Sequence, residues 1–288
     1  MPDDPFVAHR SLLFTVAYEM LGSAADAEDV LQESWLRWAR VDRARVRDAR
    51  AYLIRIVTRQ SLNRLRAVAH NREDYIGEWL PEPLLTSPDV ADDVELADSV
   101  SIAMLTVLET LGPAERAVFV LREVFELPYD EIGDAVGKSA AATRQIARRA
   151  RRHVAARRPR ARVSRSEQQA VVDRFMLALQ TGQLQELMDV LAPDVVFIAD
   201  GGGVVASARV PIQGARRVAK LLARARHVLP VFDVTPTWLN GAPATWIDMN
   251  GETAAVSLVV EGGRITRIFA TANPQKLTRL DRPAELAR

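Results

Sequence analysis

Hydrophobic positions recur with a helical period at the start of the chain. Apolar side chains between Phe6 and Met20 repeat every three or four residues until Gly22, a residue type that commonly ends a helix. Ser23 is a suitable N-cap for a second helix, and a third is expected over about residues 48–68. This part of the chain is therefore predicted to be a helical bundle.

The helical pattern then stops and later resumes. Residues 71–97 contain Gly77 and three prolines, which are typical of a linker. The period returns at Asp98, stops at Gly112 and begins again with Pro113, which suits a first helical turn. A second helical block is thus expected after the linker.

This second block ends in a predicted helix-turn-helix. A short helix begins near Leu127 and closes at Gly137, and Ser139 can cap a basic helix that runs to about Ala156. The first turns of such a second helix enter the major groove of DNA. An arginine-rich surface helix is the alternative. The side chains expected to face DNA are Ser139, Thr143, Arg144, Arg148, Arg151 and Arg152.

The pattern changes again near Ser164. Two helices, at about 166–180 and 183–191, precede a helix at about 215–225 and several strand-like runs. The expected strands are Val195–Ile198, Phe232–Trp238, Ala254–Val260 and Ile265–Ala270. Helices followed by an antiparallel meander predict an α+β domain after the two helical blocks.

Charge is strongly segregated, although the net charge of the 288 residues is only +1. Arg37 to Arg66 holds 10 arginines and two acids, Glu73 to Glu115 holds 11 acids and no Lys or Arg, and Lys138 to Ser166 holds 11 basic residues and no acid. Two basic blocks on either side of an acidic one indicate two nucleic-acid contacts joined by a segment that avoids nucleic acid or mimics it. Solvated helix faces are the alternative.

Composition narrows the class of protein. The chain has no cysteine, which excludes disulfides and thiolate metal sites and suits the cytoplasm. No apolar run approaches 18 residues, and the first ten residues lack the apolar core of a signal peptide. We therefore expect a cytoplasmic protein that does not contact a membrane.

Two stretches resemble the extracytoplasmic-function sigma factors of bacterial RNA polymerase. The run Asp26–Trp35, followed by Ala51–Ile56 and Leu65-Arg66, resembles sigma region 2; the run Leu108–Arg151 resembles region 4. The resemblance implies that core RNA polymerase and promoter DNA are the partners. Asn63 stands where the family usually has Asp, and Arg59 where many members have Asn.

The same resemblance assigns roles to individual residues. For the acids of the first run, stabilisation of a helix N-terminus is the alternative explanation. The implied polymerase contacts are Asp26, Glu28, Asp29, Gln32 and Glu33. The implied contacts to the −10 element are Arg55, Arg59, Asn63 and Arg66, and the helix-turn-helix residues above would read the −35 element.

The C-terminal part resembles the SnoaL-like, cone-shaped α+β domain, which a subset of these sigma factors carries as a fused regulatory extension. Three motifs carry this resemblance: Trp79–Pro83, Asp200–Gly203 and Asn273–Leu277. The implied interdomain regulatory residues are Trp79, Leu80, Pro81, Glu82, Asp200, Gly201, Gly202, Gly203, Asn273 and Pro274. We expect the linker to pack between the sigma domains and this domain; a solvated tether is the alternative.

Enzymatic chemistry is not expected. An isomerase of this fold needs a buried carboxylate and hydrogen-bond donors in an apolar pocket; the candidate carboxylates are Asp200, Asp233 and Asp248, but the domain has no Tyr and only His227. The four histidines are scattered without metal spacing. No catalytic residue, cofactor or metal is therefore predicted, and whether the domain binds a small molecule stays open.

The sequence thus predicts a sigma factor that directs core RNA polymerase to promoters under the control of its own C-terminal domain. Two alternatives remain: a one-component DNA-binding regulator with a ligand-sensing SnoaL-like domain, and a SnoaL-like isomerase or cyclase with an accessory DNA-binding region. The predicted domains are 1–70 for region 2, 71–97 for the linker, 98–160 for region 4 and 164–288 for the SnoaL-like domain.

Overall fold

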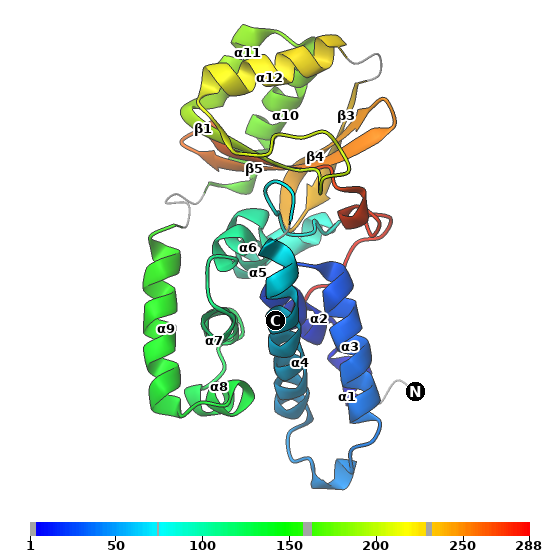
Figure 1. The fold of residues 1–288 in the computed structure, drawn as a ribbon, viewed down its shortest axis with the longest axis vertical. Coiled ribbons are helices and arrows are strands. Elements are labelled where there is room, and N and C mark those ends of the chain that lie inside the picture. Colours follow the sequence, from blue (N-terminus) through cyan, green and yellow to red (C-terminus); the bar gives the residue numbers. More distant parts are fainter. Residues whose placement is uncertain (1–3, 74, 158–162, 229–231) are drawn as a thin grey trace.

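The N-terminal block is the predicted helical bundle. In the computed structural model, which describes residues 4–73, 75–157, 163–228 and 232–288, it consists of α1 (Pro5–Ala8), α2 (Arg10–Leu21), α3 (Ala24–Trp38), the 3-10 turn η1 (Arg43–Arg45) and α4 (Ala49–Glu73) (Figure 1). Gly22 ends α2 with a φ of 67°, and Ser23 caps α3 by accepting a hydrogen bond from the Asp26 amide at 3.1 Å. Helix α4 runs past the predicted boundary at residue 70.

The second helical block begins earlier than predicted, because Asp93 caps a helix that starts at Val94 rather than at Asp98. Its elements are η2 (Pro88–Asp92), α5 (Val94–Val100), α6 (Ile102–Leu108), α7 (Pro113–Glu123), α8 (Tyr129–Val136) and α9 (Ala140–Ala155). The predicted boundary between residues 160 and 164 falls largely on residues 158–162, which lie outside the described residues.

The two helical blocks share one hydrophobic core. Helix α2 packs on α7, and α4 packs on both α7 and α8. Buried side chains from the two blocks, such as Leu13 and Leu53 with Val118 and Leu121, belong to a single cluster. Burial of these apolar side chains holds the blocks together.

The C-terminal domain is α+β, as predicted, with α10 (Arg165–Thr181), α11 (Leu184–Val190), α12 (Ala215–Val228) and one six-stranded sheet. The strands are β1 (Leu191–Asp200), β2 (Ile212–Gln213), β3 (Asp233–Leu239), β4 (Ala242–Met249), β5 (Glu252–Glu261) and β6 (Arg264–Thr271), in the order β2-β1-β6-β5-β4-β3. The meander from β3 to β6 is antiparallel, whereas β1 pairs with β6 in parallel.

Strands β2 and β4 were not predicted. Strand β4 contains Pro243 and two alanines, so its apolar pattern is weak. A different signal was present: Asn240-Gly241 is a preferred dipeptide of two-residue hairpin turns, and both residues adopt a positive φ, 53° and 74°, between β3 and β4.

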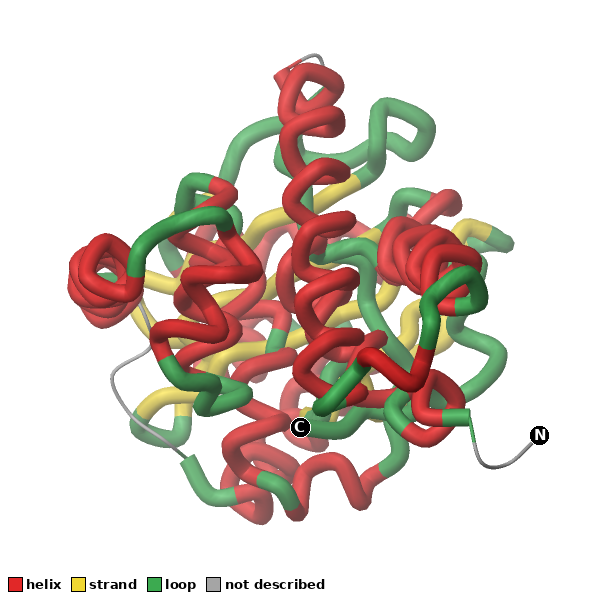
Figure 2. The backbone as a smooth tube through the Cα atoms, turned by 90° about the horizontal axis from the view of Figure 1, so that it is seen from below, coloured by secondary structure: helices red, strands yellow, loops and turns green. Residues whose placement is uncertain are grey.

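The two faces of the sheet have different partners. Helices α10, α11 and α12 cover one face and enclose a core that includes Phe175, Val218 and Ile268 (Figure 1). On the other face, Phe269 packs with Leu80 of the linker and Ile102 of α6. The sheet therefore lies between its own helices and the sigma-like blocks, an arrangement that Figure 2 shows from below, with the helical blocks in front of the strands.

The end of the chain returns to the helical blocks. After η3 (Pro274–Lys276), the Ala284 amide donates to the Leu85 carbonyl at 2.8 Å, and the Ala287 amide donates to the Thr15 hydroxyl of α2 at 3.1 Å. Arg288 forms ion pairs with Asp93 and Glu95 at the start of α5. Nothing in the sequence pattern predicted this contact.

Candidate functional site

Two of the five predicted polymerase contacts on α3 are half-buried and form short ion pairs within the protein. Asp26 forms an ion pair of 2.5 Å with Arg64 of α4, and Glu28 forms one of 2.7 Å with Arg10 of α2. The Asp26 amide also belongs to the capped first turn of α3. These two acids therefore have partners within the bundle, and Asp26, in the first turn of α3, also lies where the alternative explanation, stabilisation of a helix N-terminus, applies.

The other three predicted contacts form an exposed surface on α3. Asp29 forms a longer ion pair with Arg64, at 3.4 Å, yet 58% of its side chain is exposed. Gln32 and Glu33 are exposed, and Glu33 accepts a hydrogen bond from Gln60 at 2.6 Å. This outward polar surface is accessible to another protein.

The predicted −10 contacts lie along α4. Asn63 and Arg66 are exposed, and Arg55 is half-buried. Arg59 is exposed but engaged, because its guanidinium donates to the Asp134 carbonyl of α8 at 2.8 Å. The candidate −10 surface is thus in direct contact with the first helix of the helix-turn-helix.

The predicted helix-turn-helix is α8 and α9. Gly137 adopts a φ of 71° at the end of α8, and the Ser139 hydroxyl accepts from the Ala142 amide at 3.2 Å, which caps α9. Arg151 forms a 3.0 Å ion pair with Glu123 of α7. The exposed candidate DNA contacts are Ser139, Arg144, Arg148, Arg151 and Arg152.

Thr143 was wrongly predicted to face DNA. Its side chain is fully buried, and its hydroxyl donates to the Ser139 carbonyl at 2.9 Å. It lies three and four residues before Ile146 and Ala147, so it belongs to the same inward stripe of α9. It packs where Gly133 of α8 leaves room, since a Cβ on that glycine would lie 3.3 Å from the Thr143 hydroxyl.

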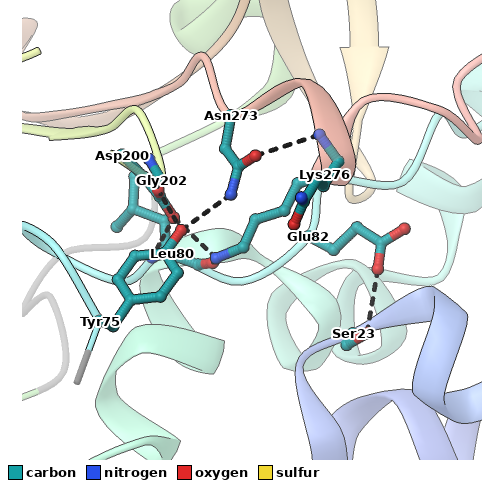
Figure 3. A network of polar contacts seen from close by, with 9 residues as sticks. Ser23, Tyr75, Leu80, Glu82, Asp200, Gly202, Asn273 and Lys276 are labelled. Atoms are coloured by element: carbon teal, nitrogen blue, oxygen red, sulfur yellow. Dashed lines mark hydrogen bonds and ion pairs between the residues drawn. The ribbon is translucent and has the colours of Figure 1, made fainter. Parts of the chain in front are cut away.

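Asp200, at the end of β1, is the centre of a polar network between the linker and the C-terminal domain (Figure 3). Its side chain is completely buried. It accepts hydrogen bonds from the Tyr75 hydroxyl at 2.6 Å, the Leu80 amide at 2.9 Å and the Gly202 amide at 3.0 Å, and it forms a 2.7 Å ion pair with Lys276. A buried carboxylate tolerates burial when it is paired and hydrogen-bonded in this way.

Lys276 extends this network to two aromatic rings of the linker. Its ammonium group lies 4.1 Å from the centre of the Trp79 ring and 5.0 Å from that of Tyr75, distances typical of cation–π contacts. It also donates to the Leu80 carbonyl at 2.5 Å. Burial and the hydrogen bond to Asp200 raise the pKa of Tyr75, which keeps its hydroxyl protonated as a donor.

The Asn273–Leu277 motif belongs to the same contact between the linker and the C-terminal domain. Asn273 donates from its side-chain amide to the Tyr75 hydroxyl at 2.9 Å and caps η3, while Pro274 is the exposed first residue of that turn. Gly202 has a φ of 60°, and a Cβ there would lie 2.3 Å from the Asn273 side chain. A Cβ on Gly201 would lie 2.2 Å from a backbone oxygen, and one on Gly203 would contact Ile76 at 3.0 Å. Gly202 and Gly203 thus allow η3 and the linker to approach the end of β1, whereas Gly201 allows the loop around Val205 to fold back on that end.

Glu82 ties the opposite side of the linker to the N-terminal bundle. Its carboxylate accepts from the Ser23 hydroxyl and the Ala25 amide, both at 3.1 Å, and so caps α3 from outside the helix (Figure 3). The Glu82 amide donates to the Gly22 carbonyl at 2.8 Å. Burial raises the pKa of this carboxyl group. Leu80, Pro81 and Glu82 are all buried, so this segment is packed rather than solvated.

Asn240 is an interdomain residue that sequence reasoning missed. It lies in the β3–β4 turn, and its side-chain amide donates to the Tyr18 hydroxyl at 2.7 Å and to the Val100 carbonyl at 2.8 Å, while its oxygen accepts from the Leu84 amide at 2.9 Å. One buried side chain thus connects all three blocks and the linker. Burial raises the pKa of Tyr18.

The candidate carboxylates do not form a catalytic pocket. Asp200 is held by the interdomain contacts above, Asp233 is exposed on an edge strand, and Asp248 accepts from the Gly251 amide in a turn. Within the described residues no group of His, Asp and Glu side chains could hold a metal ion. No described helix is long and apolar enough to span a membrane.

Comparisons with known proteins agree with this arrangement. The Sigma-70 region 2 family matches residues 6–70, and the Sigma-70 region 4 family matches residues 101–154. The chain is 36% identical to the ECF RNA polymerase sigma factor SigJ of Mycobacterium tuberculosis, over 95% of this chain and 92% of that protein. It is also 36% identical to the probable ECF RNA polymerase sigma factor SigI of the same species, over 94% and 92%.

A solved structure covers all three blocks. The crystal structure of Mycobacterium tuberculosis SigJ superposes with a TM-score of 0.76 and 32% identity, over 95% of this chain and 97% of that one. The likeness includes the C-terminal domain, so it extends beyond the two sigma regions. With the bundle, the helix-turn-helix and the α+β extension in the same order, this chain belongs to the extracytoplasmic-function RNA polymerase sigma factors.

Proposed function

We propose that this sigma factor acts in the cytoplasm and contacts core RNA polymerase through Asp29, Gln32 and Glu33 of α3. It would read promoters with α4 and α9. Its C-terminal domain would hold it in a closed, inactive arrangement. The −10 contacts would be Arg55, Arg59, Asn63 and Arg66. The −35 contacts would be Ser139, Arg144, Arg148, Arg151 and Arg152.

The distance between the promoter elements supports a closed state. Elements centred near −10 and −35 are separated by about 25 base pairs, or roughly 85 Å at 3.4 Å per base pair. Here Arg59 of the −10 surface donates to Asp134 of the helix-turn-helix at 2.8 Å. The two DNA-reading surfaces cannot both reach their elements until α8 separates from α4.

The C-terminal domain is placed to oppose that separation. The linker that joins the sigma blocks is fixed on one side to Asp200 and on the other to the start of α3 through Glu82. Asn240 bonds to the linker, to α2 and to α5 together. Opening would therefore break contacts of the C-terminal domain as well as the shared core of the helical blocks.

The burial of Asp200 against the linker is the observation that carries the proposal. Asp200→Ala would leave the buried Leu80 amide without its acceptor, which costs about 1–3 kcal/mol, and would remove the ion pair of Lys276, which keeps its bond to the Leu80 carbonyl. We expect a larger open population and more polymerase-dependent transcript. Asp248→Ala removes a carboxylate from the same domain without touching the linker, and is the matched control.

The absence of cysteine from the sequence makes opening directly measurable. Cysteines introduced at Arg37 on α3 and Gln145 on α9, both exposed, can carry a fluorescent pair. Energy transfer should fall in the Asp200→Ala protein and not in the Asp248→Ala protein. Equal energy transfer and equal transcript from one promoter in all three proteins would refute control by the C-terminal domain.

A cavity favours a second function, the binding of a small molecule. It has a volume of about 940 Å³ and lies between α5 and α6, the end of α9 and strands β4 to β6, with Met104, Val154 and Phe269 among its lining residues. Ligand sites of this size are common at domain interfaces. A metabolite screen by thermal shift, repeated on Met104→Trp to fill the cavity, tests this role.

A further inference from the structure

Helix α12 of the C-terminal domain carries a third basic surface, outside the two sigma regions. Residues 201–232 contain six Arg or Lys residues and no acid. The apolar side of α12, which includes Ala215, Val218 and Ala219, is buried against the domain core. Its opposite side is exposed and consists of Arg216, Arg217, Lys220 and Arg224, which we call the α12 basic stripe.

The spacing of these cations places them in one row. Arg216, Lys220 and Arg224 follow one another at intervals of four residues. Arg217 lies three residues before Lys220, so it is a neighbour of the row on the helix surface. At 1.5 Å per residue the row is about 12 Å long, which is the rise of three to four base pairs of DNA.

The α12 basic stripe is not neutralised within the part of the chain that the structure describes. None of its four side chains forms an ion pair with a described carboxylate, in contrast to Arg64 with Asp26. The acids of the neighbouring helix α11 bond elsewhere, Glu186 to Thr181 and Asp189 to Gln185. Like charges four residues apart destabilise a helix, so the row does not serve the stability of α12.

The location keeps this surface accessible. Helix α12 covers the face of the sheet that is turned away from the sigma regions, at the opposite end of the molecule from α8 and the start of α4 (Figure 1). Separation of the sigma regions would leave it exposed. The surface is therefore available whether the protein is closed or engaged on a promoter.

We propose that the α12 basic stripe is a third DNA contact, which binds the phosphate backbone of duplex DNA without reading sequence. A row of four cations without ion-pair partners can bind the successive phosphates of a polyanion. DNA is the expected polyanion because the sigma regions already bring the chain to it. A membrane helix would instead need a broad exposed apolar face; on α12 that face is buried, and only Leu221 and Val228 are exposed at its margin. The proposal does not depend on control by the C-terminal domain.

The test measures the salt dependence of binding to a duplex without promoter sequence. Each phosphate contact contributes about 0.9 to the slope of log association constant against log salt concentration. That slope should fall by about two to four in a quadruple variant of the whole 288-residue chain that carries Arg216→Gln, Arg217→Gln, Lys220→Gln and Arg224→Gln. At 50 mM salt its affinity should fall at least tenfold.

A matched pair of double variants separates this surface from general loss of charge. Arg216→Gln with Lys220→Gln should reduce the slope by one to two, whereas Arg174→Gln with Arg282→Gln, which removes two exposed cations from the same domain, should leave it unchanged. Melting temperatures of all variants should agree with that of the wild type, since exposed substitutions change stability little.

Two results would overturn the proposal. One is a slope in the quadruple variant that equals the wild-type slope. The other is an equal decrease of the slope in both double variants, which would show that the slope depends on the net charge of the protein and not on the α12 basic stripe. Sedimentation with vesicles of phosphatidylserine and phosphatidylcholine completes the test: vesicle binding that depends on the stripe, with an unchanged DNA slope, would assign the surface to a membrane instead.

Discussion

Replacement of Glu19 by Gln should stabilise the closed arrangement and remove much of its pH dependence. Glu19 lies on α2, yet its carboxyl group is completely buried where α2 meets α5 and α7. The Ser99 hydroxyl donates to one of its oxygens at 2.7 Å, and the other has no hydrogen-bond partner among the described residues. Burial raises its pKa to about 8, although the guanidinium group of Arg116 opposes the shift.

The surroundings of Glu19 explain why ionisation of its carboxyl group is unfavourable in the closed state. It lines a cavity of about 170 Å³ whose other lining residues include Glu95, Asp98, Glu123 and Glu126, and no basic residue is among the described residues that line this cavity. Arg116 is the cation nearby, but it also forms an ion pair with Glu109. A proton on Glu19 is therefore favoured in the closed state and lost once the site is hydrated.

The size of the effect follows from the two pKa values. The carboxyl group has a pKa near 4.5 in the open or unfolded chain and near 8 in the closed state, so below pH 4.5 it does not lower the stability of the closed state. Its cost in stability then grows by about 1.4 kcal/mol per pH unit until about pH 8. Stability of the closed state thus falls as pH rises through this window, and at pH 7 the cost is about 3 kcal/mol. Gln keeps an acceptor for Ser99 and has no proton to lose.

The assay compares unfolding and energy transfer at pH 5.5, 6.5, 7.5 and 8.5. The wild type should lose stability and energy transfer toward pH 8.5, and Glu19→Gln should lose less and melt higher at pH 7.5. Glu252→Gln, which removes an exposed carboxylate from the C-terminal domain, should keep the wild-type slope. Identical pH slopes for Glu19→Gln and the wild type would refute the reasoning.

Three further predictions concern the sigma surfaces and the linker contact. Asp29→Lys with Glu33→Lys should weaken binding to core RNA polymerase at least tenfold, with only a small fall in melting temperature from the lost contacts to Arg64 and Gln60, because both substituted side chains are exposed; unchanged affinity would remove α3 from the polymerase contact. Arg144→Ala should reduce binding at one position of the −35 element by about 1–3 kcal/mol, and an equal loss on every promoter sequence would make this residue a backbone contact. Gly202→Ala should disrupt the interdomain contact, since its φ is 60° and the new Cβ would lie 2.3 Å from Asn273; a wild-type melting temperature and energy transfer would show that the contact adapts.

Local sequence signals other than hydrophobic periodicity also predict parts of the fold and of the candidate site. Caps such as Ser23 and glycines such as Gly137 lie where the pattern predicts helix ends, because these effects act within a few residues. Thr143 was misplaced despite a sufficient signal, its spacing from Ile146 on the buried stripe. The Asn240-Gly241 turn was missed although its dipeptide favours a hairpin.

Local and medium-range order was thus determined by the sequence itself: the two helical blocks, the capped basic helix α9, the α+β end of the chain and the family. The tertiary structure alone decided which groups meet across long separations. Tyr75 and Asp200 are 125 residues apart, Asn240 and Tyr18 are 222 apart, and Ala287 reaches Thr15 over 272. Burial, pKa and hydrogen-bond partners depend on such meetings, and they arise only when the apolar faces of separate blocks pack together. For this reason the shared core, the contact between Arg59 and the helix-turn-helix, and the buried carboxyl group of Glu19 could be learned only from the folded chain.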